Sequence, residues 1–214
     1  CSDLGIVKID LLGLGMMAAL QDAFTMINTR RPAGAEPIAM WSIPPGDPQV
    51  YGMLQRADTV GVFQVESRAQ MATLPRLKPA NFYDLVVEVA LIRPGPITGQ
   101  MVHPYLDRRA GRAEVVYPHP SLEPILKRTL GVPLFQEQLL RMAMTAAGFT
   151  GGQAEELRRA MGFKRSEKRM RAIEGQLRDG MARNGITGEA ADTVVRSITS
   201  FALYGFPESH SASF

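Results

Sequence analysis

The chain has 214 residues, 45% of them hydrophobic, and a formal net charge of +3 with a single cysteine. This hydrophobic content argues for a folded core and against disorder, and no apolar run reaches the roughly 20 residues of a transmembrane helix. One cysteine excludes a disulfide framework and a cysteine-based zinc site, and it suits the cytosol. The sequence begins at Cys1 and ends at Phe214 within an apolar stretch. We therefore expect a piece of a longer protein, with one domain and part of another.

The first predicted element is a strand at residues 6–12, followed by a helix from Leu14 to about Thr29 with apolar residues at helical spacing. Residues 30–48 are rich in proline and glycine and have no regular period, which is typical of a linker. Asp47-Pro48 then predicts the start of a helix that runs to about Ala57, because proline is favoured at the first helical position.

Residues 82–91 form a short apolar segment that fits either a helix or a strand, and the prolines after it end the segment in both cases. Beyond Pro120, capping residues and glycine stops predict a chain that is mostly helical. These helices are expected at residues 121–128, 136–147, 150–161, 166–184 and 187–205. The prediction is thus a mainly α fold with a minor β part near residue 10.

Basic residues are concentrated in one stretch of the chain. Residues 158–183 carry nine Lys or Arg against three acids, a local charge of +6, so the remainder of the chain has a charge of −3. A basic stretch inside a mildly acidic chain is a candidate contact for nucleic acid or for a nucleotide phosphate. A solvated helix face is the alternative interpretation.

The start of this stretch groups four cations around one helix end. Arg158 and Arg159 precede a glycine stop, and Lys164 and Arg165 follow it. Glu155 lies three and four residues before the two arginines, so one of them can be merely part of a helix-surface ion pair. Guanidinium groups match phosphate oxygens two at a time, which makes the cluster a candidate phosphate site.

Asp10 is an isolated carboxylate in the apolar run Val7-Lys8-Ile9-Asp10-Leu11-Leu12. Because side chains alternate along a strand, Lys8 and Asp10 project from the same side. A carboxylate and a cation at a strand end suit a metal bound to a phosphate. The alternative is a half-exposed strand with polar residues on its solvent-exposed face.

Other motifs carry less weight. Gly13-x-Gly15-x-x-Ala18 formally matches a dinucleotide-binding fingerprint, but Glu36, at a plausible distance, follows proline-rich sequence rather than a second strand. P-loop, nucleophile-elbow and zincin motifs are absent from the sequence. The three histidines, at positions 103, 119 and 210, do not have metal-ligand spacing.

The block around Asp10 and five later blocks together resemble bacterial family C DNA polymerases, the DNA polymerase III alpha subunit family. The later blocks are GVFQVES (61–67), LIRPGP (91–96), FQEQ (135–138), LRRAMG (157–162) and YGFPESH (204–210). The chain is most similar to the error-prone paralogue of the alpha subunit. Replicative members usually have Asn in place of Pro207 and tend to have a Lys pair in place of Phe163-Lys164.

The resemblance implies the end of a β-polymerase-like palm followed by a helical fingers domain. Residues 1–30 are expected to be the palm piece, 31–48 the linker, and 49–214 the fingers, truncated at the C-terminus. The implied reaction is template-directed transfer of a nucleotide from a deoxynucleoside triphosphate to a primer 3′-hydroxyl, and the resemblance to the error-prone paralogue implies synthesis past DNA damage. Two Mg²⁺ ions would assist it, with a D-x-D ligand pair upstream of this chain. The isolated chain is therefore expected to be inactive.

The resemblance also implies roles for individual residues. Asp10 is expected to be a catalytic metal ligand, and Lys8 to neutralise nearby phosphate charge. The expected nucleotide-binding residues are Arg93, Arg158, Arg159, Lys164, Tyr204, Phe206, Ser209 and His210. The basic members would hold the triphosphate, and Tyr204 or Phe206 would flank the nascent base pair, although packing into the core is an equal alternative for these aromatics.

Expected partners are primer–template DNA and deoxynucleotides, with a sliding clamp and accessory polymerase factors bound through regions outside this chain. No membrane partner is expected, and the location is expected to be cytoplasmic. The competing hypothesis is a non-catalytic helical module that binds nucleic acid. A D-x-D motif on a strand upstream of Cys1 would distinguish the polymerase from that module.

Overall fold

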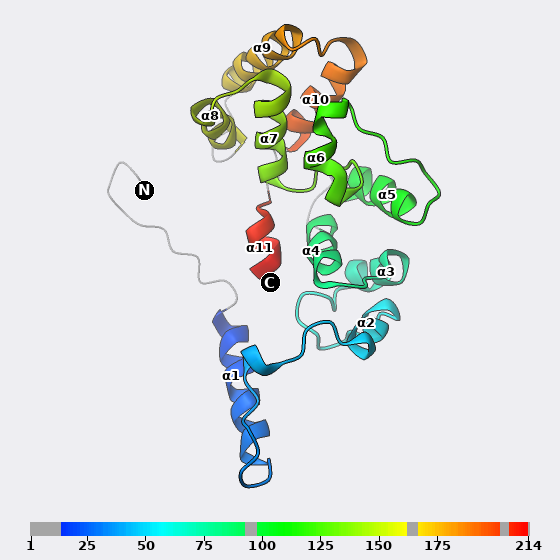
Figure 1. The fold of residues 1–214 in the computed structure, drawn as a ribbon, viewed down its shortest axis with the longest axis vertical. Helices are drawn as coiled ribbons and strands as arrows, with labels where there is room; N and C mark the ends of the chain where they lie inside the picture. The colour runs from blue at the N-terminus through cyan, green and yellow to red at the C-terminus, as the bar shows by residue number, and fades with distance from the viewer. Residues whose placement is uncertain (1–13, 93–97, 162–166, 202–205, 214) are drawn as a thin grey trace, which may run out of the picture.

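The computed structural model describes residues 14–92, 98–161, 167–201 and 206–213, and within these ranges the chain is helical without a β-strand (Figure 1). The mainly α fold is therefore confirmed. The strand predicted at residues 6–12 lies outside the described residues and stays a prediction. Among the described helices, none combines the length and apolar character needed to cross a membrane.

The first helix, α1 (Leu14–Thr29), has the predicted bounds and projects away from the other helices (Figure 1). The segment after it is irregular, as predicted for a linker, apart from the short 3₁₀ helix η2 (Met40–Ser42). This segment folds back on α1, because Asn28 exchanges two 2.8 Å hydrogen bonds with the backbone N–H and carbonyl of Ile38.

Four helices form a first group: α2 (Pro48–Gln55), α3 (Arg68–Leu77), α4 (Phe82–Leu91) and α5 (Thr98–Arg109). Asp47 caps α2 as predicted, since its carboxylate accepts a 2.8 Å hydrogen bond from the N–H of Gln49. The ambiguous segment 82–91 is a helix. Helices α3 and α5 were not predicted from the sequence, and each contains an internal proline, Pro75 or Pro104.

A second group packs around α7. The helix predicted at residues 121–128 is broken into short turns, and the later helices have bounds close to those predicted. In chain order they are η3 (Pro120–Leu122), α6 (Glu123–Leu126), η4 (Lys127–Thr129), α7 (Gln136–Ala147), α8 (Gly151–Met161), α9 (Glu167–Arg183) and α10 (Gly188–Phe201). Gly148 ends α7 in the left-handed conformation, with φ +68°, which glycine adopts without strain.

The short helix α11 (Glu208–Ser213) joins the two groups. The helix after Thr187 was predicted to be the last, so α11 was not predicted from the sequence. Helix α11 packs against α4 and lies close to the start of α7 (Figure 1). Three hydrogen bonds hold α11 and the residues just before it: Gln136 N–H donates to the Phe206 carbonyl, Glu208 N–H to the Glu137 carboxylate, and the Ser211 hydroxyl to the Val86 carbonyl.

Candidate nucleotide and DNA interface

The predicted site residues divide into two sets. Arg158, Arg159, Phe206, Ser209 and His210 lie in the described part of the chain. The others, Lys8, Asp10, Arg93, Lys164 and Tyr204, lie outside it, and their roles stay predictions. Within the described ranges no group of three or more His, Cys, Asp or Glu side chains is arranged to hold a metal ion.

Arg158 and Arg159 lie on the exposed face of α8, near its C-terminal end. The start of α8 is set by reciprocal bonds: Thr150 N–H donates to the Gln153 side chain at 2.9 Å, and Gln153 N–H donates to the Thr150 hydroxyl at 3.3 Å. Within the helix that this cap starts, the spacing of three and four residues places Glu155 beside both arginines, one turn away.

Glu155 binds both arginines at once. Arg158 donates from Nε and Nη2 to the two carboxylate oxygens, each at 2.7 Å, and Arg159 donates from Nε to Oε1 at 3.1 Å. The side-chain hydrogen bonds from Arg158 and Arg159 lower the pKa of Glu155 to about 2. Two guanidinium groups share one carboxylate, so these three residues keep an excess positive charge on a solvent-facing surface.

The YGFPESH motif continues into α11, where Phe206 packs partly against the core between α4 and α5. The Phe206 and His210 rings meet edge to face, with centroids 5.2 Å apart and planes at 85°. The backbone of Phe206 is tied to α7 as well, whereas Ser209 is exposed. Phe206 thus makes the core contact that was the alternative to base stacking, and its contact with a base stays a prediction.

A charged contact fixes the start of α11 against the first helical group. The Arg128 guanidinium lies 3.8 Å from the centre of the Tyr83 ring and 3.6 Å from the Glu208 carboxylate. Burial and the neighbouring Glu208 raise the pKa of Tyr83 to about 12. Because Glu208 belongs to the motif, these contacts position Phe206 and Pro207 relative to α4.

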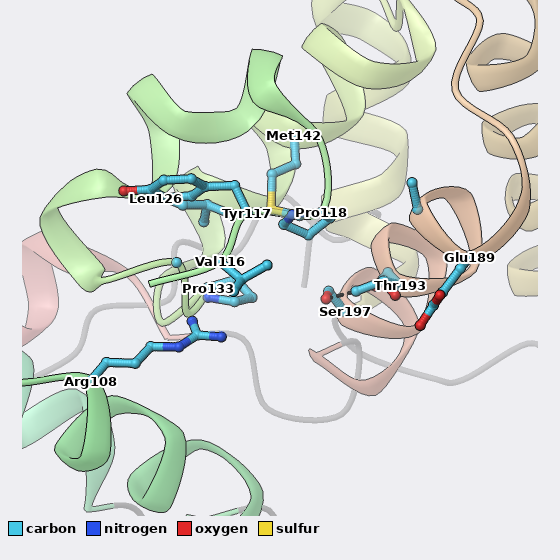
Figure 2. A pocket seen from close by; sticks show the side chains of 12 residues that line it. Arg108, Val116, Tyr117, Pro118, Leu126, Pro133, Met142, Glu189, Thr193 and Ser197 are labelled. Carbon is cyan, nitrogen blue, oxygen red and sulfur yellow. Dashed lines mark hydrogen bonds between the residues drawn. The ribbon is translucent and has the colours of Figure 1, made fainter. Parts of the chain in front are cut away.

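Arg108 lines two cavities. The first, about 460 Å³, lies between the chain near Val116 and helix α10, and Figure 2 shows the Arg108 side chain on the opposite side of it from Thr193 and Ser197. Arg108 donates a 2.7 Å hydrogen bond to the Leu130 carbonyl. The next residue, Gly131, has φ +77°, and a Cβ there would lie 2.8 Å from Arg108 Nη1, so glycine permits this approach.

The second cavity, about 760 Å³, lies where α3 and α5 end. Five basic residues line it: Arg76, Lys78, Arg108, Arg109 and Arg112. This group was not predicted from the sequence, because neither helix was predicted and their basic ends are about 30 positions apart. Recognition of the Ser67-x-x-Gln70 capping box, whose two reciprocal bonds are both formed, would have located α3.

Comparison with known proteins identifies the class first. Residues 16–185 match the family described as "Bacterial DNA polymerase III alpha subunit finger domain". The chain belongs to the bacterial DNA polymerase III alpha subunit family, and the predicted resemblance is confirmed. The match begins inside the segment assigned to the palm, so the predicted domain boundaries stay a prediction.

The curated relatives define the branch of the family. The chain is 56% identical over its whole length to "Error-prone DNA polymerase" of Anaeromyxobacter dehalogenans strain 2CP-1, where the alignment covers 19% of the relative. Proteins of the same name from Corynebacterium jeikeium and Nocardia farcinica are 58% and 59% identical over the whole chain, which covers 18% of each. The chain therefore spans about a fifth of the length of these relatives.

Proposed function

We propose that this chain supplies the fingers, and the adjoining end of the palm, of an error-prone DNA polymerase. The observation that carries the proposal is identity of 56–59% over the whole chain to relatives of that name. The full-length protein would transfer a nucleotide from a deoxynucleoside triphosphate to a primer 3′-hydroxyl on a DNA template. The competing hypothesis, a non-catalytic module, predicts DNA binding without nucleotide incorporation.

Asp10 and Lys8 are assigned to the catalytic centre. Asp10 would be one carboxylate ligand of two Mg²⁺ ions, whose chemistry is to activate the primer hydroxyl and to stabilise charge on the leaving pyrophosphate. A carboxylate is the ligand type that Mg²⁺ prefers. One carboxylate cannot hold two ions, so the remaining ligands would come from other parts of the full-length protein.

The arginines of α8 are assigned to the triphosphate. Among the described residues their acidic partner is Glu155, which lies at the surface and leaves the pair with a net positive charge. A triphosphate carries several negative charges and offers oxygens at the spacing that guanidinium groups match. It can therefore replace or share the Glu155 contact. Arg93 and Lys164 would complete this contact, and catalysis here is chiefly positioning and electrostatics.

The catalytic assignment is tested by Asp10→Asn in the full-length protein. The substitution keeps the shape of the side chain and removes the charge that binds the metal, so we expect nucleotide incorporation to fall by a factor of about 100 or more while primer–template affinity changes little. Near-normal turnover would show that Asp10 is structural and would contradict the palm assignment.

The assignment of α8 is tested by replacing Arg158 and Arg159 together with alanine. We expect a higher KM for nucleotide and a lower kcat, with DNA affinity and its salt dependence almost unchanged. The control replaces Arg141 and Arg196, two exposed arginines of α7 and α10, and should leave the KM unchanged. A large loss of DNA affinity with an unchanged nucleotide KM would instead make α8 a contact to the DNA backbone.

A further inference from the structure

The cavity at the ends of α3 and α5 is a second cationic site, separate from α8, and we refer to it as the α3–α5 basic pocket. Its walls carry the five basic residues named above, and the other lining residues are apolar: Pro75, Leu77, Ala110 and Leu130. No acidic or aromatic side chain is among the lining residues of this described region. Helices α3 and α5 lie on the opposite side of the molecule from α8 (Figure 1).

The fold holds the base of this pocket rigidly. Arg109 donates from Nη1 and Nη2 to the two oxygens of Asp84, at 2.7 and 2.8 Å, and from Nε to the Leu77 carbonyl at 2.6 Å. The last contact satisfies a carbonyl at the C-terminal end of α3, which has no partner within the helix. Arg108 is held in the same way by the Leu130 carbonyl. Both side chains are therefore ordered before any ligand binds.

Charge in the pocket is not balanced by the residues around it. Asp84 pairs with Arg109, and Asp107 pairs with Arg112 at 2.7 Å. Among the described residues, no acidic side chain lies within ion-pair distance of Arg76, Lys78 or Arg108. The C-terminal ends of α3 and α5 each contribute roughly half a negative charge, which offsets about one of these three cations. The excess of about two positive charges favours an anion.

We propose that the α3–α5 basic pocket binds the phosphodiester backbone of a DNA strand. Guanidinium and ammonium groups recognise phosphate oxygens, and such contacts position a strand without reading its sequence. A free nucleotide fits less well, because the lining has no aromatic ring to stack on a base and no side-chain hydrogen-bond acceptor. The inference rests on the proposed function, since DNA is the polyanion that a polymerase engages.

The pocket would bind DNA independently of its sequence, at a distance from the residues assigned to the incoming nucleotide. Because Arg108 and Arg109 are already ordered by backbone carbonyls and Asp84, binding requires little further loss of side-chain entropy at these positions. The exposed cations Arg76, Lys78 and Arg112 would supply the contacts that vary with salt. The pocket is thus expected to change DNA affinity and leave nucleotide selection unaffected.

The test replaces the three exposed cations with glutamine, as Arg76→Gln, Lys78→Gln and Arg112→Gln together, in the full-length protein. Arg109 is left intact because it holds the fold. The control, Lys127→Gln, Arg141→Gln and Arg196→Gln, makes the same change in net charge at exposed positions outside the pocket and outside the basic stretch at residues 158–183. Binding is followed by fluorescence anisotropy of a labelled primer–template with a single-stranded template overhang, between 50 and 200 mM salt.

We expect the pocket variant to bind DNA about tenfold or more weakly at the lowest salt, with the slope of log affinity against log salt smaller in magnitude by roughly 2–3. The control should change affinity less than twofold. Nucleotide KM at saturating DNA should stay unchanged. The single variant Arg76→Glu should weaken binding in the same direction, which keeps the test decisive if the triple variant folds poorly.

Equal effects of the pocket variant and its control would overturn the proposal, because only overall charge would then matter. A raised nucleotide KM with unchanged DNA affinity would also overturn it and assign the pocket to the nucleotide. Failure of the proposed function is seen separately, as a wild-type protein that does not extend the primer. Anisotropy would still report whether the pocket binds DNA in that case.

Discussion

Arg109 and Arg158 each lie in the last turn of a helix and each bind a carboxylate through two hydrogen bonds, but in different surroundings. The Arg109 and Asp84 side chains are 24% and 8% exposed, against 48% and 40% for Arg158 and Glu155. Removing one member of a buried pair leaves an uncompensated charge, whereas an exposed pair exchanges its partner for water or a ligand at little cost. The first pair is therefore structural, and the second is available for binding.

The same contrast extends to the two helical groups. In the α2–α5 group, Asp84 and Glu88 lie inside the packed helices. In the α7–α10 group ion pairs such as those of Arg178 lie at the surface, and the buried contacts are apolar, involve close backbone packing, or join uncharged groups such as Gln138 and Thr129. Substitution of charges should therefore destabilise the first group, and substitution of small residues the second.

The largest effect is expected from Arg109→Ala. It removes both bonds to Asp84 and the bond to the Leu77 carbonyl, and we expect a loss of about 2–4 kcal/mol in the free energy of unfolding, reduced somewhat by the partial exposure of Arg109. The matched variant Arg158→Ala should leave the melting temperature unchanged within error. Chemical denaturation of the two variants tests the contrast, and equal losses would contradict it.

Glu88 should make stability depend on pH. Its side chain is fully buried, neither carboxyl oxygen has a hydrogen-bond partner among the described residues, and burial raises its pKa to about 8 from 4.5. Between pH 4.5 and 8 the folded protein then holds a proton that the unfolded chain releases, so stability decreases as pH rises through this window.

The measurement compares unfolding free energies of the wild type and Glu88→Gln at pH 5 and pH 7. We expect the wild type to lose about 2–3 kcal/mol more than the variant over this range, because glutamine stays neutral at both values. Above pH 8 the difference should stop growing. Parallel pH profiles would mean that Glu88 is ionised in the folded protein and has a partner.

Close packing in the second group is tested at Gly180. A Cβ there would overlap the carbonyl of Ala147, at the contact of α9 with α7. We expect Gly180→Ala to destabilise the protein by about 1–3 kcal/mol. Gly175→Ala, in the same helix with nothing near its Cβ, should instead be neutral or stabilising by up to about 1 kcal/mol. Thermal melts of both variants distinguish local crowding from helix propensity.

The smallest effect is expected at Pro207, which lies just before α11 and accepts a 3.2 Å hydrogen bond from the N–H of Ser211 through its carbonyl. The proline side chain forms no hydrogen bond, whereas asparagine can form one. One hydrogen bond that is lost at a mispaired base is worth roughly 0.5–1.5 kcal/mol, or about three- to tenfold in discrimination between correct and incorrect nucleotides. If this position borders the nascent base pair, Pro207→Asn in the full-length protein should lower misincorporation by that factor. Asparagine is also a favoured helix cap, so stability should be kept.

Single-nucleotide misinsertion assays measure this effect, and correct incorporation serves as the internal control. An unchanged error rate would show that Pro207 only shapes the turn into α11. It would not bear on the proposed role of the α8 arginines, because nucleotide KM and not fidelity tests that role.

Local signals in the sequence determined much of this chain. The helix spacing of α1 and α7, the caps at Asp47 and Thr150, and the glycine stop at Gly148 each act within a few residues, so they can be read without the fold. The sequence blocks that resemble family C DNA polymerases likewise indicated the family without knowledge of the fold. The pairing of Glu155 with the arginines of α8 was also predictable, because one helical turn sets that spacing.

Tertiary structure decided the rest. Helices α3 and α5 contain prolines that oppose a helix locally, and the packing of their apolar faces with α4 compensates for this. Whether a charge is buried depends on that packing, so the sequence gives no sign that Arg109 is structural. The α3–α5 basic pocket follows for the same reason, since residues about 30 positions apart meet only when both helices pack together.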